Sequence, residues 1–144
     1  MNTKAEKYNQ FLQENKVTCF QYQEIQENAL HPVLYRTFME INGQNLPVML
    51  VIDDSIYVML QVRVGSALVK DTNKVAVLDY VNKLNENYKV FKYYVTENGD
   101  IVIESCIPAS DTGFEPQMIH AVIDVILNHL NEEYPKLMKV VWAD

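Results

Sequence analysis

Glycine is scarce in this sequence, which has four among its 144 residues: Gly43, Gly65, Gly99 and Gly113. Each of them stands alone, so neither of the glycine-rich loops that cradle phosphates, GxxxxGKS/T and GxGxxG, is present. The GxSxG motif of serine hydrolases is also missing. The sequence therefore predicts no catalytic residue and no bound cofactor.

Cysteine is scarcer still, with Cys19 and Cys106 far apart in the chain and no CxxC pair or neighbouring histidine. A disulfide or a cysteine-based metal site needs partners at short, regular spacing. Free cysteine otherwise behaves as a small apolar residue. We therefore expect both cysteines to be reduced and buried, and we expect no metal site.

Positive charge is also in deficit, because 12 Lys and Arg residues stand against 19 Asp and Glu, for a net charge of −7. The field of such a chain repels phosphate backbones and anionic lipid, and the basic residues form no stripe that could overrule it. Nucleic acid and membrane surfaces are thus excluded as expected partners. Neutral or basic protein surfaces remain.

Long apolar runs are missing as well. The longest mostly apolar stretch, 46–52, is far too short to span a bilayer, and the first residues contain no apolar segment of the signal-peptide kind. We expect a cytoplasmic protein. Hydrophobic residues make up 49% and charged residues 22% of the chain, which is the composition of an ordinary globular domain. Residues 1–144 should therefore fold as a single domain.

Hydrophobic periodicity predicts an α+β chain in the order helix, strands, helix, hairpin, helix. Tight connections between the strands favour an antiparallel sheet with helices packed on one face. The tail at 138–142 is expected to be a short strand or a docked coil. The expected helices are 3–15 with Thr3 as N-cap, 74–88 and 115–133, and the expected strands are 17–27, 33–41, 46–52, 56–64 and those of the hairpin 92–105.

The strands 46–52 and 56–64 predict a hairpin with a three-residue loop, Asp53-Asp54-Ser55. That loop pairs Ile52 with Ile56, Leu50 with Val58 and Val48 with Leu60, which forms one continuous apolar face. The opposite face is also partly apolar, so it needs cover from another helix of this chain or from a partner. The candidate protein-interaction residues on it are Met49, Val51, Tyr57 and Met59.

The stretch KYYVTENGDIVIES, residues 92–105, reads as a hairpin around an acidic, glycine-bearing tip. A two-residue Asn98-Gly99 turn would mix apolar and charged groups on both faces. A three-residue loop, Glu97-Asn98-Gly99, instead places Phe91, Tyr93, Val95, Ile101, Ile103 and Ile107 on one face and Lys92 opposite Glu104. The second register suits a half-buried sheet, and it gives Gly99 the left-handed position.

Acidic and histidine pairs are the remaining candidates for chemistry. Asp53 and Asp54 could hold a metal, but short polar side chains are also typical of a turn, and we favour the turn. His120 with Asp124, and His129 with Glu133, are spaced i, i+4 on the last helix. We favour solvated pairs off the apolar stripe, with a metal or small-ligand site as the alternative. His31 is expected to be structural.

Residues 74–135 resemble the YbjN-like family of bacterial proteins. The likeness rests on the helix VAVLDYVNKLNENYK, the strand VFKYYVT, the tip ENGD, the strand IVIESCIP and a long helix closing on Tyr134-Pro135. Within these, Leu84 and Asn85, Phe91 and Tyr93, and Gly99-Asp100 carry it. The resemblance implies a fold similar to type III secretion chaperones, with no catalytic residues to carry over. The four strands expected between 17 and 64 exceed the three of the simple layout.

Two functions compete on this reading. The first is a non-enzymatic protein-binding or chaperone-like module, a homodimer, which uses the face of Met49, Val51, Tyr57 and Met59 or the outer side of the last helix. The second is an enzyme or a small-ligand or metal-binding protein that uses the histidines of the last helix.

Overall fold

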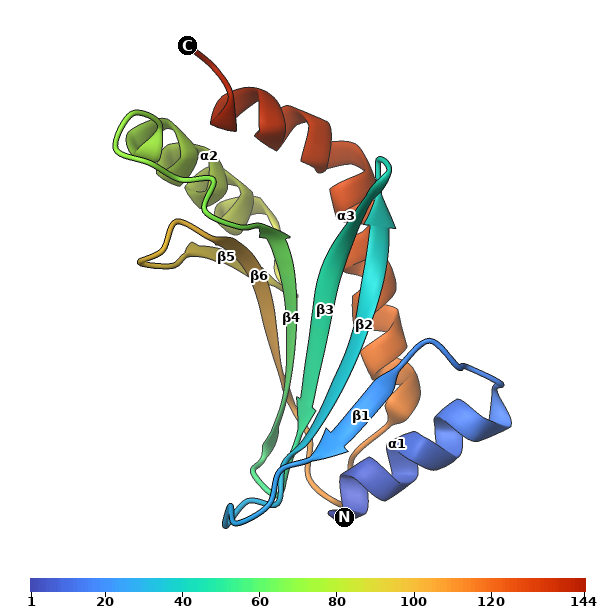
Figure 1. Cartoon of the computed structure of the whole chain (residues 1–144). Coiled ribbons are helices and arrows are strands. Elements are labelled where there is room, and N and C mark those ends of the chain that lie inside the picture. Colours follow the sequence, from blue (N-terminus) through green and yellow to red (C-terminus); the bar gives the residue numbers. More distant parts are fainter.

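The computed structural model describes residues 1–144 and contains three helices and six strands, which confirms the α+β fold (Figure 1). The four strands in the first half of the chain are present. In chain order the elements are α1 (Thr3–Glu14), β1 (Gln21–Glu24), β2 (Val33–Ile41), β3 (Gln44–Ile52), β4 (Tyr57–Gly65), α2 (Lys74–Asn87), β5 (Lys92–Val95), β6 (Ile101–Pro108) and α3 (Pro116–Val141).

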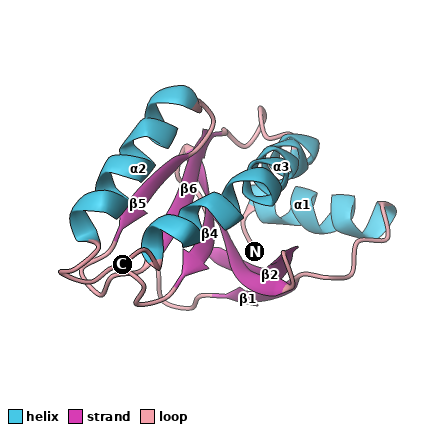
Figure 2. Ribbon diagram, turned by 90° about the horizontal axis from the view of Figure 1, so that it is seen from above, coloured by secondary structure: helices cyan, strands magenta, loops and turns pink.

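All strand pairs are antiparallel, and the order across the sheet is β1-β2-β3-β4-β6-β5. Helix α3 runs behind β2 and β3 in Figure 1, and the view from above shows α1 and α3 on the same side of the sheet (Figure 2). Helix α2 packs against β5 and α3. The other side of the sheet is not covered by a helix (Figure 2).

The core follows from side-chain alternation along the strands, since successive residues of a strand point to opposite faces. In β3 and β4 the buried residues alternate with half-buried or exposed ones. The residues facing the helices join those of α1, α2 and α3 in one cluster of 30 buried apolar side chains. The strand residues of β3 and β4 in that cluster are Leu46, Val48, Leu50, Ile52, Val58, Leu60, Val62 and Val64.

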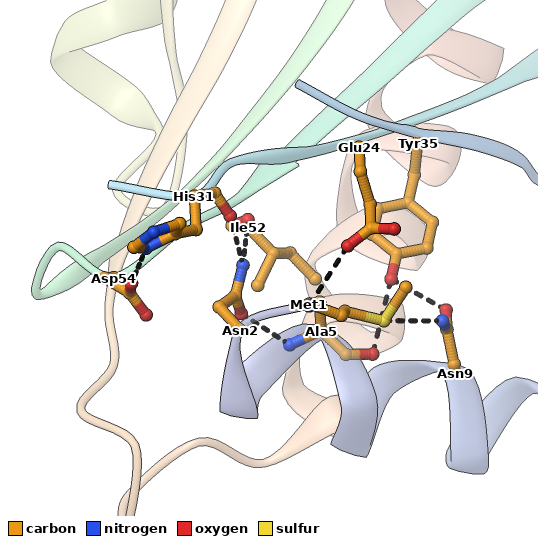
Figure 3. A network of polar contacts seen from close by, with 9 residues as sticks. All are labelled: Met1, Asn2, Ala5, Asn9, Glu24, His31, Tyr35, Ile52 and Asp54. Carbon is orange, nitrogen blue, oxygen red and sulfur yellow. Dashed lines mark hydrogen bonds and ion pairs between the residues drawn. The ribbon is translucent and has the colours of Figure 1, made fainter. Parts of the chain in front are cut away.

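Helix α1 begins one residue earlier than the sequence indicated, because Asn2, and not Thr3, is its N-cap. The Asn2 side chain accepts from the backbone N–H of Ala5 at 2.8 Å and donates to the carbonyls of His31 and Ile52, both at 2.9 Å (Figure 3). An asparagine at this position satisfies helix donors that would otherwise be unpaired. The same side chain thus fixes the start of α1 to the end of β3 and to the loop that precedes β2.

The hairpin β3–β4 has a longer connection than expected, which corrects the predicted register. Ile52 pairs with Val58 and not with Ile56, so five residues, 53–57, form the loop. The observed register differs from the expected one by two residues. Because side chains alternate with a period of two, each one still points to the predicted face, and the apolar pattern cannot distinguish the two registers. Ile56, expected inside, is exposed.

Lys4 accounts for the longer loop. Its ammonium group is buried and donates to the carbonyls of Ser55 at 2.6 Å, Tyr57 at 3.1 Å and Ala109 at 3.1 Å. Burial lowers the pKa of Lys4, while the nearby carboxylates of Asp53, Asp111 and Asp54 oppose that shift. A tight three-residue turn would not present these carbonyls to the same ammonium group.

The hairpin β5–β6 has the predicted three-residue register, with Val95 opposite Ile101 and Lys92 opposite Glu104. Gly99 has a φ of +83°, the left-handed conformation that glycine adopts without strain. Its carbonyl also accepts from the backbone N–H groups of Leu68 and Val69, each at 3.0 Å. The acidic tip is therefore a turn that is docked onto a neighbouring loop.

Three other expectations were wrong. Strand β1 covers four residues and not 17–27, because residues 17–20 leave the sheet and the Phe20 ring packs near Tyr8. Helix α3 continues through Pro135 to Val141, because Leu137 and Val141 extend its buried stripe and the missing N–H of Pro135 lies on the exposed side. Both cysteines are free, as expected, but exposed, because Cys106 lies on the uncovered face and Cys19 lies outside the strands.

Candidate functional site

The uncovered side of the sheet, called here the open face, is formed by the strand residues that point away from the helices. Its central part comes from β2, β3, β4 and β6, and the strand register arranges it in three rows across the sheet. Row one holds Leu34, Val51, Met59 and Cys106; row two holds Arg36, Met49, Gln61 and Glu104; row three holds Phe38, Pro47, Arg63 and Val102.

The four candidate residues from the sequence all lie on the open face. Met49, Val51 and Met59 are half-buried in its centre, whereas Tyr57 lies at one end, opposite Pro108, and is 43% exposed. Neighbouring strand side chains supply the partial burial, because no helix covers this side (Figure 2). The sequence left open whether a helix of this chain covers this face, and in the structure none does.

Sequence reasoning missed the contributions of β2 and β6. Phe38, on β2, is 66% exposed and is the most exposed of the large apolar residues that the strands carry on this face. The alternation of Leu34, Arg36 and Phe38 within 33–41 was a usable signal. Their position beside Met49 follows from the β2–β3 pairing, which the sequence pattern does not give.

Both arginines of the chain, Arg36 and Arg63, line one hollow on the open face. The hollow has a volume of about 410 Å3, and its walls also include Phe38, Pro47 and Val102. Arg63 has a weak ion pair with Asp100, at 4.0 Å, and no ion pair of the structure includes Arg36. An acidic chain thus presents its two guanidinium groups together, in an apolar setting.

A polar network lies at the β6 side of the open face. The Gln61 amide donates to the Glu104 carboxylate at 2.6 Å and to the Tyr94 hydroxyl at 3.2 Å. The Tyr94 hydroxyl in turn donates to Glu104 at 3.0 Å. Burial and the Glu104 carboxylate raise the pKa of Tyr94. These contacts hold the Glu104 carboxylate in place at the opposite end of row two from Arg36.

The comparison with protein families agrees with the fold. Residues 9–138 match the sequence model of the YbjN family, which is described as "Putative bacterial sensory transduction regulator". The match extends well beyond residues 74–135 and includes all six strands. The chain belongs to the YbjN family. No curated protein matches it.

The description of the YbjN family is that of a regulator and names no reaction. The side chains of this YbjN chain include no group of three or more His, Cys, Asp or Glu arranged to hold a metal ion. None of its helices has the length and apolar composition to cross a bilayer. Asp53 has the turn role that we favoured, since its carboxylate accepts from the backbone N–H of Ser55 at 3.0 Å.

The histidine pairs of α3 are not the solvated pairs that the sequence indicated. His129 and Glu133 are buried, and Nε2 of His129 shares a hydrogen bond of 2.6 Å with the Tyr93 hydroxyl. Glu133 accepts a hydrogen bond from the Tyr80 hydroxyl. The imidazole lies among three aromatic rings: Tyr93 of β5, and Tyr88 and Phe91 of the segment between α2 and β5. Nδ1 of His129 has no partner.

His120 is half-buried between aromatic rings and not paired with Asp124. Its Nε2 shares a hydrogen bond of 3.0 Å with the Tyr8 hydroxyl, and its ring lies against Phe11 and Phe20. Burial lowers the pKa of both His120 and His129, while the acidic neighbours on α3 oppose the shift. The two histidines therefore serve packing contacts between α3 and the rest of the chain. His31, as expected, has a structural contact, a hydrogen bond of 2.8 Å between its Nδ1 and the Asp54 carboxylate (Figure 3).

Proposed function

We propose that this chain is a non-enzymatic protein-binding module that acts through the open face, as a regulatory or chaperone-like protein in the cytoplasm. The observation that carries the proposal is the uncovered apolar face of the sheet, centred on Met49, Val51 and Met59. A contiguous apolar patch with a polar rim is typical of an interaction site. The family description, a regulator of sensory transduction, supports a binding role.

The side chains of the open face suit a protein partner better than a small polar ligand. Methionine is flexible and polarisable, so Met49 and Met59 can adapt to the shape of an apolar partner surface. Tyr57 and Phe38 are exposed and supply large contact area at a small cost in side-chain entropy. Arg36 and Arg63 add directional groups at the rim, and arginine is enriched in protein interfaces.

We further propose that residues 1–144 act as one domain and that the module is a homodimer. Packing of a second sheet on the first is the common way to cover an apolar sheet face. A homodimer through this face would remove Met59 and its neighbours from water in both copies. The alternative surface, the outer side of α3, is less continuous, because its exposed apolar residues Met118 and Val125 lie about two turns apart.

Size-exclusion chromatography with light scattering tests this proposal on four proteins: wild type, Met59→Glu, Val125→Glu and Val75→Glu. The wild type should have about twice the monomer mass of 16.7 kDa at micromolar concentration. Met59→Glu should be a monomer, because it places a charge in the centre of the buried face. Val75, on α2, is 75% exposed, so Val75→Glu is a matched control that should stay dimeric.

The result for Val125→Glu separates the two surfaces. It should leave the wild-type mass unchanged if the open face is the interface. A monomeric wild type, or a dimer that Met59→Glu leaves intact, would contradict the proposal. Thermal unfolding of each variant checks that loss of the dimer is not loss of the fold.

A further inference from the structure

We infer that the open face binds a second copy of itself, with a two-fold axis that runs parallel to the strands between β3 and β4. The inference rests on the proposed homodimer through the open face and adds the geometry of the complex. It follows from the order of charged and apolar residues in the three rows of the open face. When a row of one copy is laid over the same row of a second copy in the opposite direction, the residues that meet are complementary.

The strand order provides the symmetry. The boundary between β3 and β4 is the midpoint of the six-stranded sheet, with three strands on each side. We place the two-fold axis just outside the open face, parallel to the strands and over this boundary. Rotation by 180° about it generates a second copy whose open face lies against that of the first. It places β2 over the partner's β6 and β3 over the partner's β4, while each row stays over the same row. Two sheets packed in this way are aligned within about 30°.

Row two then brings opposite charges together. Arg36 is at one end of the row and Glu104 is at the other, with Met49 and Gln61 between them. In the two-fold arrangement Arg36 meets the partner's Glu104, and the symmetry makes this pair twice. Arg36 has no ion pair within its own chain, and the Glu104 carboxylate is already oriented by Gln61 and Tyr94. Arg36 thus has no ionic partner in its own chain, and the Glu104 carboxylate, which already accepts two hydrogen bonds, is fixed in position to accept from Arg36 across the interface.

Rows one and three bring apolar residues together, while Arg63 of row three lies over the partner's Pro47 and keeps its own ion pair with Asp100. In row one Leu34 meets the partner's Cys106, and Val51 meets the partner's Met59. In row three the exposed Phe38 lies over the partner's β6 at Val102, a residue that is itself only 4% exposed. By the same symmetry each copy places its exposed Phe38 ring on the β6 side of the other, as expected for an isologous interface.

Charge excludes the other simple two-fold arrangement. An axis perpendicular to the strands, along row two, would place Arg36 over the partner's Arg36 and Glu104 over the partner's Glu104. Like charges in a desolvated interface repel. If this perpendicular axis were moved along the strands to lie between two rows, Arg36 would lie over an apolar residue of the partner, either Leu34 of row one or Phe38 of row three. Its charge would then be unpaired.

The open face is large enough for such a dimer. Four strands about 4.8 Å apart and roughly 27 Å long present roughly 500 Å2 of projected area. Side-chain relief and the outer strands β1 and β5 bring the accessible area closer to the about 800 Å2 per partner of a standard interface.

A charge-reversal cycle tests the axis. The proteins are wild type, Arg36→Glu, Glu104→Arg and the double variant, and the measurement is the dimer dissociation constant by sedimentation equilibrium. Each single variant should weaken the dimer by at least roughly ten-fold, because it places like charges together twice. The double variant restores opposite charges and should return to within roughly three-fold of wild type. Thermal unfolding checks that all four proteins are folded.

A cross-link provides an independent readout. In a Cys19→Ser background, Leu34→Cys should give a covalent dimer when the dilute, monomeric protein is treated with one equivalent of a short bis-maleimide and is then concentrated, because residue 34 lies over the partner's Cys106. The control is Glu40→Cys, on the same strand and the same face but about 20 Å further along, and it should give no covalent dimer.

The outcomes separate this inference from the proposed function. A dimer that Met59→Glu disrupts but that the double charge reversal does not restore would overturn the axis and leave the open face as the interface. Equal cross-linking from positions 34 and 40 would overturn the axis in the same way. A monomeric wild type would overturn both the inference and the homodimer.

Discussion

The side-chain amide of Asn85, on α2, binds both backbone polar groups of Tyr93, on the outer edge of β5. Its carbonyl oxygen accepts from the Tyr93 N–H at 2.7 Å, and its NH2 donates to the Tyr93 carbonyl at 3.1 Å. The amide therefore takes the place of a neighbouring strand at a sheet edge, where unpaired backbone groups otherwise favour aggregation.

Replacement of Asn85 with alanine should therefore open this edge. We expect a loss of about 1–2 kcal/mol in the free energy of unfolding, measured by urea denaturation, since two hydrogen bonds are lost. We also expect faster binding of thioflavin T on incubation. Asn82→Ala, at an exposed position of the same helix, is the control. Equal stability and aggregation of the two variants would contradict the role of Asn85.

Gly99 allows a second prediction, because it combines a left-handed backbone with a close contact. A Cβ at this position would lie 2.4 Å from the Val69 carbonyl oxygen. Gly43 has a similar φ of +79°, but a Cβ there would meet nothing within 4 Å. Gly99→Val should cost more than about 2 kcal/mol, while Gly43→Val should cost the backbone strain alone, about 1–2 kcal/mol. Chemical denaturation compares them, and equal losses would contradict the docking of the turn.

His129 predicts a loss of stability on acidification. Burial lowers its pKa below the ordinary 6.5, so the unfolded chain binds a proton more readily than the folded chain. The free energy of unfolding should therefore fall as the pH is lowered from 7.5 to 5.5, by at most about 1.4 kcal/mol per pH unit for this group. His120 adds to the effect in the same direction. The slope with pH should be smaller in His129→Phe, and an unchanged slope would refute this account.

The buried tyrosines predict the opposite trend in alkali. Burial raises the pKa of Tyr8, Tyr35 and Tyr93 above the ordinary 10.0, so above pH 10 the unfolded chain loses these protons first. The free energy of unfolding should fall by roughly 4 kcal/mol per pH unit there, about 1.4 for each tyrosine. The lowered pKa of Lys4 makes the free energy of unfolding rise with pH up to the ordinary lysine pKa of 10.5. This is one group against three tyrosines, so the net trend is a fall.

Denaturant unfolding at pH 9, 10 and 11, with tyrosinate absorbance as a second signal, checks the alkaline prediction. Tyrosinate of the buried residues should form together with the loss of circular dichroism. Full ionisation of all nine tyrosines near pH 10 in a chain with native circular dichroism would contradict it.

The sequence was most informative where side-chain alternation alone decides the structure. For the hairpin β5–β6 the two candidate registers differed by one residue, so they placed Tyr93 on opposite faces and the apolar pattern could distinguish them. For β3–β4 the observed and expected registers differ by two residues, which leaves every face unchanged. The contacts of Lys4 with the loop 53–57 decide between them, and they join segments about 50 residues apart.

The same limit applies to the candidate site. Met49, Val51, Tyr57 and Met59 could be assigned to one face, because two strands predicted to form a hairpin carry them and the two-residue error in their register leaves each face unchanged. Arg36 and Glu104 join them through the pairing of β2 with β3 and of β4 with β6, and such long-range order has no local signal. His129 was misplaced for a related reason, since its burial depends on the tyrosine that β5 directs toward α3.

Cys106 offers the most direct measurement of the central claim, that the open face is a protein-binding surface and is covered in the assembled protein. Its thiol is exposed in the single chain and lies opposite Met59 in row one. In a Cys19→Ser background, the labelling rate of Cys106 by a maleimide should fall more than about ten-fold as the protein concentration passes the dimer dissociation constant. It should stay fast at all concentrations when Met59→Glu is added. A rate that is independent of concentration, while light scattering reports a dimer, would place the interface elsewhere and contradict the claim.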